Sequence, residues 1–418
     1  MSLASALIIH HGFDMTSSSS PNQISHSGLS TPVLLLMSVA CGLCAGGNYF
    51  NQPLLHSIAT SFQVSEATAA FTVTVAQVAY AFGLLLLVPL GDKLERRSLV
   101  VLLMLLAATG QFISGFTNDI GLLFAGIVMA GLFSVAAQIL VPMAATLSDP
   151  ARSGRAVGIV MSGLLIGILM ARSVAGLLSG LGGWHTVYRV AGVTMLVVAL
   201  ALWFVLPSSR NPVRASYFQI LASMATLIRD MPRLRSRSII GALAFASVSA
   251  LFSTMALLLS GPAHGLDDAQ IGLVGLIGVA GALMANVAGR LSDRGWDRQT
   301  SMVCAILLLL SWGGLYLGGT SLLWFVAGML LIDLALQGLH ISNQQIVYQL
   351  MPEARSRINA VYMTTYFIGA ALGSAAGSLA WNIGGWGAIC VTGAILAMLT
   401  GFMLWHDGRL QHRASGSP

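Results

Sequence analysis

The chain has 418 residues, of which 56% are apolar and only 8% are charged, and its formal net charge is +6. Ordinary soluble domains carry roughly 25% charged residues, so this composition excludes a soluble protein of this length. The positive charge does not indicate nucleic-acid binding, because the basic residues are confined to loops and form no basic helix face. The composition therefore predicts an integral membrane protein.

Residues 1–30 are polar and rich in serine, most clearly at 17–20. Such a segment has too little apolar surface to fold by itself, and we expect a disordered cytoplasmic tail. The short apolar stretch before His10 and His11 lacks a basic region ahead of it, which argues against a cleaved signal peptide. Met1 and Met15 both remain possible starts of the chain.

Apolar segments long enough to cross a bilayer, about 20 residues each, follow this tail. We expect twelve spans at 31–54, 68–90, 98–116, 120–146, 155–181, 186–206, 238–261, 270–291, 300–318, 321–350, 358–382 and 385–405. The fold class is therefore an all-α membrane protein with two six-helix bundles, at 31–206 and 238–405. A linker at 207–237 joins them, and a cytoplasmic tail at 406–418 follows.

The Lys and Arg residues mark one side of the membrane. Eighteen of the twenty fall in loops of the same parity, and Arg172 and Arg189 are the exceptions. Cytoplasmic loops carry the Lys/Arg excess, because this bias sets the orientation of insertion. We expect both termini and the linker in the cytoplasm of a bacterial cell, with the protein in its inner membrane.

The two predicted bundles repeat each other. Matched residues lie 202 positions apart at Pro150/Pro352, Arg155/Arg357, Gly167/Gly369, Gly183/Gly385 and Trp184/Trp386, and 201 apart at Asp92/Asp293. Six pairs in register indicate a duplicated six-helix unit. Duplicated bundles around a site near the bilayer midplane are typical of secondary transporters.

The loop after the second span carries a specific motif. It reads Val88-Pro89-Leu90-Gly91-Asp92-Lys93-Leu94-Glu95-Arg96-Arg97, and a counterpart stands at 289–298. This resembles the Gly-x-Leu-x-Asp-basic-x-Gly-basic-basic signature of the major facilitator superfamily, with Val88 and Glu95 in place of the glycines. The resemblance implies an inner gate in which Asp92 pairs with bases across the interface between the halves. The gating residues it implies are Asp92, Lys93, Arg96, Arg97, Asp293 and Arg294.

The fifth span reads Gly167-Ile168-Leu169-Met170-Ala171-Arg172-Ser173-Val174-Ala175-Gly176. It resembles the Gly-x-x-x-Gly-Pro-x-x-Gly-Gly motif of the drug and sugar efflux branch of the superfamily, with Arg172 in place of the proline. The segment Asn48-Tyr49-Phe50-Asn51-Gln52-Pro53 is also similar to bacterial members of that branch. Small residues allow close approach of helices. We expect this packing role for Gly163, Gly167, Gly176, Gly369, Gly373 and Gly377.

Polar residues inside the spans predict the walls of a cavity. A charge at the centre of a span costs about 2.5–3.5 kcal/mol on insertion scales and usually has a function, which singles out Arg172 and Asp333. Asp333 begins a polar stripe on one face of the tenth span, with Gln337, His340 and Gln344 at helical spacing. Other expected cavity residues are Asn48, Asn51, Gln52, Gln77, Tyr80, Gln138, Tyr362 and Tyr366.

The pattern favours a monomeric secondary transporter that exports a small organic molecule by proton antiport, with Asp333 as proton carrier and Arg172 as counter-ion for the substrate. Two alternatives remain, a proton-coupled uptake symporter for a metabolite and a non-transporting membrane sensor or scaffold. Phosphate-binding, catalytic and metal-ligand patterns are missing from the sequence. We therefore expect no enzyme activity, no cofactor, no metal and no nucleic-acid partner. The expected partners are the substrate, protons and the lipid bilayer.

Overall fold

The computed structural model describes residues 29–149, 152–210, 216–278, 284, 287, 288, 290, 291, 294–351 and 355–415. This part of the chain is almost entirely helical and contains no strand. The first half comprises α1 (Thr31–Gly46), η1 (Gln52–Leu54), α2 (Leu55–Phe62), α3 (Glu66–Leu86), η2 (Val88–Asp92), α4 (Arg96–Phe116), α5 (Ile120–Phe133), α6 (Ala136–Leu147), α7 (Ser153–Gly182) and α8 (Trp184–Val205). After α9 (Tyr217–Asp230), the second half comprises α10 (Pro232–Phe252), α11 (Met255–Ser260), α12 (Asp268–Val274), η4 (Gly275–Gly278), α14 (Asp297–Leu317), α15 (Leu322–Leu350) and α16 (Arg355–Ser415).

The helices agree with a twelve-span membrane protein. Nine helical segments of the described chain are long and apolar enough to cross a bilayer. One of them, in α16, holds two spans, because Gly384 and Gly385 leave helical geometry and turn the chain back. Helix α1 and the segment Asp268–Gly278 are shorter apolar helices, and they overlap the expected first and eighth spans.

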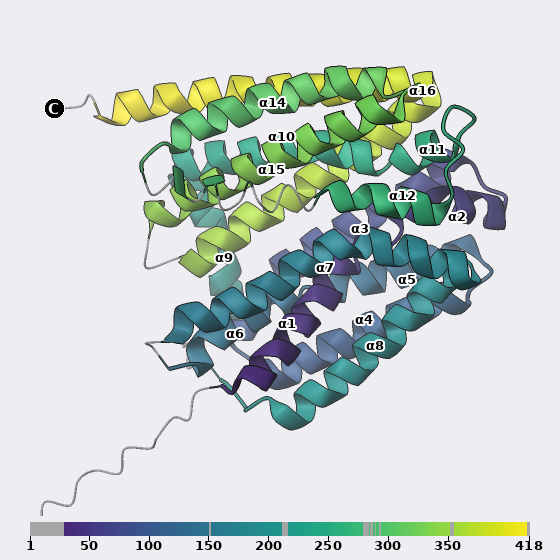
Figure 1. Ribbon diagram of the computed structural model, residues 1–418. Helices are drawn as coiled ribbons and strands as arrows, with labels where there is room; N and C mark the ends of the chain where they lie inside the picture. Colours follow the sequence, from purple (N-terminus) through teal and green to yellow (C-terminus); the bar gives the residue numbers. More distant parts are fainter. Residues whose placement is uncertain are drawn as a thin grey trace, which may run out of the picture.

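The two halves form separate groups of helices, the first below and the second above in Figure 1. Both halves contain helices in very close contact, such as α1 with α7 and α10 with α16. A Cβ atom on Gly167 would collide with the backbone of Gly42, and one on Gly373 would collide with the backbone of Ala246. The remaining glycines that we expected in helix packing make contacts of the same kind. They are Gly163 against Ser38, Gly176 against Asp268, Gly369 against Ala242, and Gly377 against Ala250 and Ser253.

Matched turns at one end of the molecule support the repeat. Gly183 separates α7 from α8 with φ +77°, and Gly385 turns α16 back with φ +58°. Left-handed φ values favour glycine, which has no Cβ to clash. The two glycines lie 202 positions apart, so the halves use the same turn at the same point.

The two ends of the bundle differ in charge. We call the end with residues 93–97, 152–155, 229–237, 294–298 and 407–409 the arginine-rich end. The opposite end, with residues 117–119, 183–184 and 261–268, is the far end. Helix α9, the start of α1 and the end of α16 all lie at the arginine-rich end, on the left in Figure 1.

Several expected spans are broken within the structure. The first is interrupted by turns at residues 47–51, the fourth at Ser134 and Val135 between α5 and α6, and the seventh at Ser253 and Thr254. Asn48 and Asn51 therefore lie in an unwound segment and not within a continuous helix. Such breaks occur in membranes where protein surrounds the exposed backbone groups, and Asn48 and Asn51 are both buried.

The linker and the tail also contain more structure than their sequences indicate. Residues 217–230 of the linker form α9, and α10 begins at Pro232, within the expected linker. Helix α16 extends to Ser415, and Asp407 of the expected tail is fully buried. Of the expected tail at 1–30, residues 1–28 lie outside the described residues.

Candidate functional site

Arg172 lies buried where the two halves meet. It is ten residues before the end of α7, or about 15 Å from the far end at 1.5 Å per residue. Its Nε donates a 2.6 Å hydrogen bond to Gln52 Oε1, and its guanidinium lies 3.7 Å from the ring centroid of Phe252 in the other half. The ring of Tyr49 lies 5.2 Å away on another side. The unwound segment after α1 thus supplies two of the groups that hold this buried cation.

Asp333 meets Arg172 from the second half. It is eleven residues into α15, about 17 Å from the far end, and therefore at the same depth as Arg172. Burial leaves it 8% exposed, and the two side chains interact electrostatically. Their charged atoms do not form an ion pair within 4 Å. Asp333 Oδ2 has no hydrogen-bond partner among the described residues, and a Cβ on Gly278 would lie 3.2 Å from it.

Three further expected cavity residues, Asn48, Asn51 and Gln77, are buried amides. Asn51 donates to Thr72 Oγ1 at 3.1 Å, Gln77 donates to Ser249 Oγ at 3.1 Å, and Asn48 donates to the Cys44 carbonyl at 3.4 Å. The side-chain carbonyl oxygens of all three amides are buried and have no partner in the described part of the chain. Buried polar groups are normally paired, so three buried acceptors without partners favour a site for a polar ligand.

An aromatic cluster lies next along the interface, toward the arginine-rich end. Its members are Tyr80, Phe245, His340, Tyr362, Tyr366 and Phe367. Tyr366 stacks on Phe245 with ring centroids 4.2 Å apart, and Tyr80 reaches across the halves to Phe367 at 4.5 Å. His340 Nδ1 lies 3.2 Å from the Tyr362 hydroxyl, and its ring centroid is 4.8 Å from that of Tyr366.

The polar stripe of α15 extends beyond this cluster. Gln337 is half-buried, and Gln344 donates to Asn359 Oδ1 at 3.3 Å. Gln138 of α6 donates to the Tyr80 hydroxyl at 3.4 Å and also lines a cleft at the arginine-rich end. Contacts therefore run from Tyr366 through Phe367 and Tyr80 to Gln138 at the wall of that cleft.

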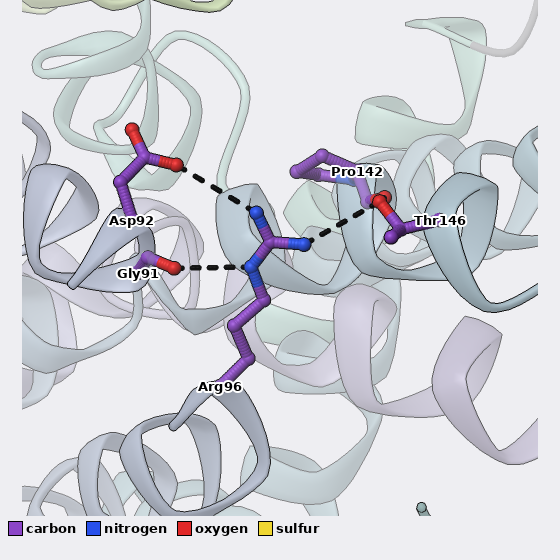
Figure 2. Close-up of polar contacts among 5 residues, drawn as sticks. All are labelled: Gly91, Asp92, Arg96, Pro142 and Thr146. Carbon is purple, nitrogen blue, oxygen red and sulfur yellow. Dashed lines mark hydrogen bonds and ion pairs between the residues drawn. The ribbon is translucent and has the colours of Figure 1, made fainter. Parts of the chain in front are cut away.

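The cleft lies between the motif loop of the first half and the start of α16. It is lined by Val88, Pro89, Gly91, Asp92, Arg96, Gln138, Ile139, Pro142, Ile220, Met224, Arg357 and Ala360. Figure 2 shows the contacts of the Arg96 guanidinium, where Nη2 lies 3.6 Å from Asp92 Oδ1 and Nε donates to the Gly91 carbonyl at 3.0 Å. Nη1 donates to Thr146 Oγ1 at 3.4 Å.

The partner of Asp92 in this structure belongs to its own half. The motif resemblance implied a pair across the interface, whereas here Asp92 contacts Arg96. Arg357 of the second half faces the same cleft and was missed as a site residue. The sequence signal that could have identified Arg357 is its match with Arg155, 202 positions earlier in the repeat.

The other expected gate residues have separate environments. Arg97 donates to the Leu206 carbonyl at 3.3 Å and lies over the Trp203 ring, while Lys93 is half-buried and Arg294 is exposed in a turn. Asp293 lies outside the described residues. Glu95 caps α4 by accepting from Arg97 N and Ser98 N. Partial burial raises the pKa of Glu95, but hydrogen bonds from Ser98, Ser209 and Arg97 outweigh it and hold the pKa below its usual value.

A buried ion pair in the second half was also missed. Arg237 of α10 pairs with Asp407 of α16 and donates to Asn343 Oδ1 of α15 at 3.2 Å. Both charged residues are almost inaccessible to solvent. Sequence reasoning placed Arg237 in the linker and Asp407 in the tail, and residues 170 positions apart give no local signal of contact.

Within the described chain, no group of three or more His, Cys, Asp or Glu residues gathers as a metal site. The four cysteines, including Cys41 and Cys44, are buried and free. The arrangement of charged and aromatic groups along an interface between two bundles instead suits binding and passage of a ligand.

Comparison with known sequences decides the family. Residues 37–374 match the sequence model of the Major Facilitator Superfamily. The chain belongs to the major facilitator superfamily. It is 47% identical over 387 residues to "Uncharacterized transporter YgaY" of Escherichia coli O157:H7, covering 93% of this chain and 98% of the relative. It is 25% identical over 363 residues to a "Probable sugar efflux transporter" of Helicobacter acinonychis, covering 84% and 88% of the two chains.

Among solved structures, the chain resembles the crystal structure of the nucleoside transporter NupG, with a TM-score of 0.75 and 16% identity over 90% of this chain and 99% of the other. This likeness confirms the expected major facilitator fold. As a member of the superfamily, the protein is a multi-pass membrane transporter of small molecules and not an enzyme.

Proposed function

We propose that this superfamily member exports a small organic molecule across the bacterial inner membrane in exchange for protons, by alternating access. The observation that carries the proposal is the meeting of Arg172 and Asp333, which are contributed by opposite halves and buried at the same depth. A motion that separates the halves changes this contact directly. A relative described as a probable sugar efflux transporter supports the direction of transport.

In the proposed orientation, the arginine-rich end faces the cytoplasm. The Lys/Arg excess at that end supports this, because short cytoplasmic loops carry it. The cleft beside Asp92 and Arg357 then opens to the cytoplasm, and a substrate enters it toward the aromatic cluster. This is the state from which an exporter loads its substrate.

Asp333 is the proposed proton carrier. With Arg172 nearby and Oδ2 unpartnered, its carboxylate has one charged neighbour and one free acceptor site. Protonation removes its attraction to Arg172, while a substrate that binds Arg172 competes for the same contact. Alternate occupancy by proton and substrate gives exchange. A proton moving down 100 mV contributes about 2.3 kcal/mol, sufficient for about a fortyfold gradient when tenfold needs about 1.4 kcal/mol.

Asp92 and Arg357 form the proposed inner gate. Both line the cleft in the open state, and closure of that end brings the two charges of opposite sign together. Charge-assisted pairs near the protein surface are strong enough to stabilise a state and weak enough to be broken by a rocking motion.

The test uses proteoliposomes with an imposed pH gradient and a library of small organic substrates. The wild-type protein should accumulate its substrate against a gradient on the side from which protons move. Asp333→Asn should abolish pH-driven accumulation and retain exchange between equal substrate pools, because only the proton step needs a titratable group. Arg172→Ala should weaken substrate binding.

Asp230→Asn is the matched control, since it removes an exposed carboxylate of α9 and should leave transport unchanged. Retained pH-driven accumulation in Asp333→Asn would refute the assignment of the proton carrier. Accumulation on the side to which protons move would instead identify a symporter, and the absence of flux for every substrate would favour a sensor or scaffold.

A further inference from the structure

Two carboxylates occupy equivalent positions at the far end of the two halves. Glu66 is the first residue of α3, and Asp268 is the first residue of α12. They lie 202 positions apart, the offset that relates the other repeated residues. Both are half-buried, so each keeps contact with solvent.

Each carboxylate accepts a hydrogen bond from the opposite half. Trp381 Nε1 of α16 donates to Glu66 Oε2 at 2.9 Å. Ser179 Oγ of α7 donates to Asp268 Oδ2 at 2.7 Å. The two donors, Ser179 and Trp381, are also 202 positions apart. The two contacts are therefore copies of one contact, related by the pseudo-two-fold symmetry of the halves.

The Asp268 contact is reinforced by two further interactions across the interface. Ser57 Oγ donates to the same Asp268 Oδ2 at 2.6 Å, and Ser173 Oγ donates to the Gly272 carbonyl at 2.8 Å. A Cβ on Gly176 would collide with the Asp268 carbonyl oxygen and lie 3.1 Å from the Gly272 Cα. Helices α7 and α12 are thus in backbone contact beside the carboxylate.

Within the described residues, the other side-chain hydrogen bonds between the halves lie deeper in the same part of the interface. They join Thr74 to Ser374 at 2.9 Å and Gln77 to Ser249 at 3.1 Å. At the arginine-rich end, residues of both halves line the cleft. The paired carboxylates are therefore the outermost polar contacts that hold the far end closed.

We propose that Glu66 and Asp268 are gating residues, a symmetric pair of carboxylate latches whose release opens the far end. Hydrogen bonds to a charged acceptor are stronger than neutral ones, which favours the closed far end. Because both carboxylates are partly exposed, water replaces the donors when the halves separate, so release leaves no buried charge. The inference rests on the proposed function only in requiring alternating access, and it requires neither a particular substrate nor a proton.

The experiment measures the far-end opening by the distance between two spin labels. Labels at Ser61→Cys and Ala263→Cys report the far end, and labels at Leu94→Cys and Gln349→Cys report the arginine-rich end, all at exposed positions. Glu66→Gln and Asp268→Asn should each increase the far-end-open fraction about threefold to tenfold, with a matching rise in short distances at the other end. The double variant should increase it further, because the two latches are separate contacts.

Two neighbouring carboxylates serve as controls. Asp119 and Asp267 cap helices within their own halves, and Asn is an equally good N-cap, so Asp119→Asn and Asp267→Asn should keep the wild-type distances. Ser179→Ala and Trp381→Phe remove the donors and should reproduce the opening, which keeps the test decisive if a carboxylate variant folds poorly.

Wild-type distances in Glu66→Gln, Asp268→Asn and both donor variants would overturn the proposal, as would equal opening in the Asp119 and Asp267 controls. If the labels show two distance populations but the protein shows no proton-driven transport, the proposed function is refuted and the proposal for Glu66 and Asp268 stands. The two failures are therefore distinguishable.

Discussion

Buried charges are the costliest single residues in this chain, and the structure accommodates each of them differently. Arg189 is not one of them, because its side chain is exposed; it donates to the Gly115 carbonyl at 2.6 Å and lies over the Phe116 ring at the far end. Arg237 is neutralised by Asp407 within its own half. Arg172 alone among these three shares its charge with the opposite half. A contact within one half is maintained while the halves move, whereas a contact between halves is not.

The first prediction concerns the Arg237–Asp407 pair. Asp407→Asn should leave a buried guanidinium without its counter-charge, and breaking such a pair costs about 3–5 kcal/mol. The unfolding temperature in detergent should therefore fall clearly below that of the wild type. Replacing both residues, as Arg237→Met with Asp407→Leu, should restore most of the stability, because no charge then remains buried. Equal unfolding temperatures for Asp407→Asn and wild type would show that the pair stabilises nothing.

At the scale of elements, apolar run length and turn glycines predicted most helix limits to within a few residues. The turn at Gly183 is an example, because glycine is the residue that its φ of +77° favours. The breaks inside spans were not predicted. In the first span only Pro53 signals a break, while the side chains that line the unwound turns, such as Gln52 with Arg172, come from distant segments. Helix α9 was not predicted, because the charged residues and prolines around it indicated a loop.

The second prediction concerns the motif element η2. Asp92→Asn keeps the shape of the side chain and removes the charge that closure would bring to Arg357. Transport should slow about tenfold, the effect of a shift of about 1.4 kcal/mol between the two states, with substrate affinity nearly unchanged. Transport rates and substrate binding in proteoliposomes measure the two quantities separately.

Arg357→Gln should slow transport by a similar factor, and the double variant should be no slower than either, because both changes remove one interaction. Additive losses in the double variant would separate Asp92 from Arg357 and leave Arg96 as the only partner of the carboxylate.

At the scale of the whole molecule, the sequence repeat and the distribution of charged residues predicted the architecture. The 202-residue offset predicted two equivalent bundles, and it also relates Glu66 to Asp268 and Ser179 to Trp381. The state of the molecule was beyond prediction from the sequence, because closure at the far end depends on contacts between residues such as Glu66 and Trp381, 315 positions apart. The pattern of residues gives the two halves, and their packing decides which end is open.

The last prediction concerns the orientation of the whole molecule. Single-cysteine labels at Ser208→Cys and Ala263→Cys occupy exposed positions at opposite ends of the bundle, and the four native cysteines are buried. If the arginine-rich end is cytoplasmic, a membrane-impermeant thiol reagent should label Ala263→Cys in intact cells and Ser208→Cys only after the membrane is opened. Labelling of Ser208→Cys from outside would reverse the orientation and make the cleft beside Asp92 an outward opening. An exporter would then have to load its substrate from a state with the far end open, which the latches at Glu66 and Asp268 oppose.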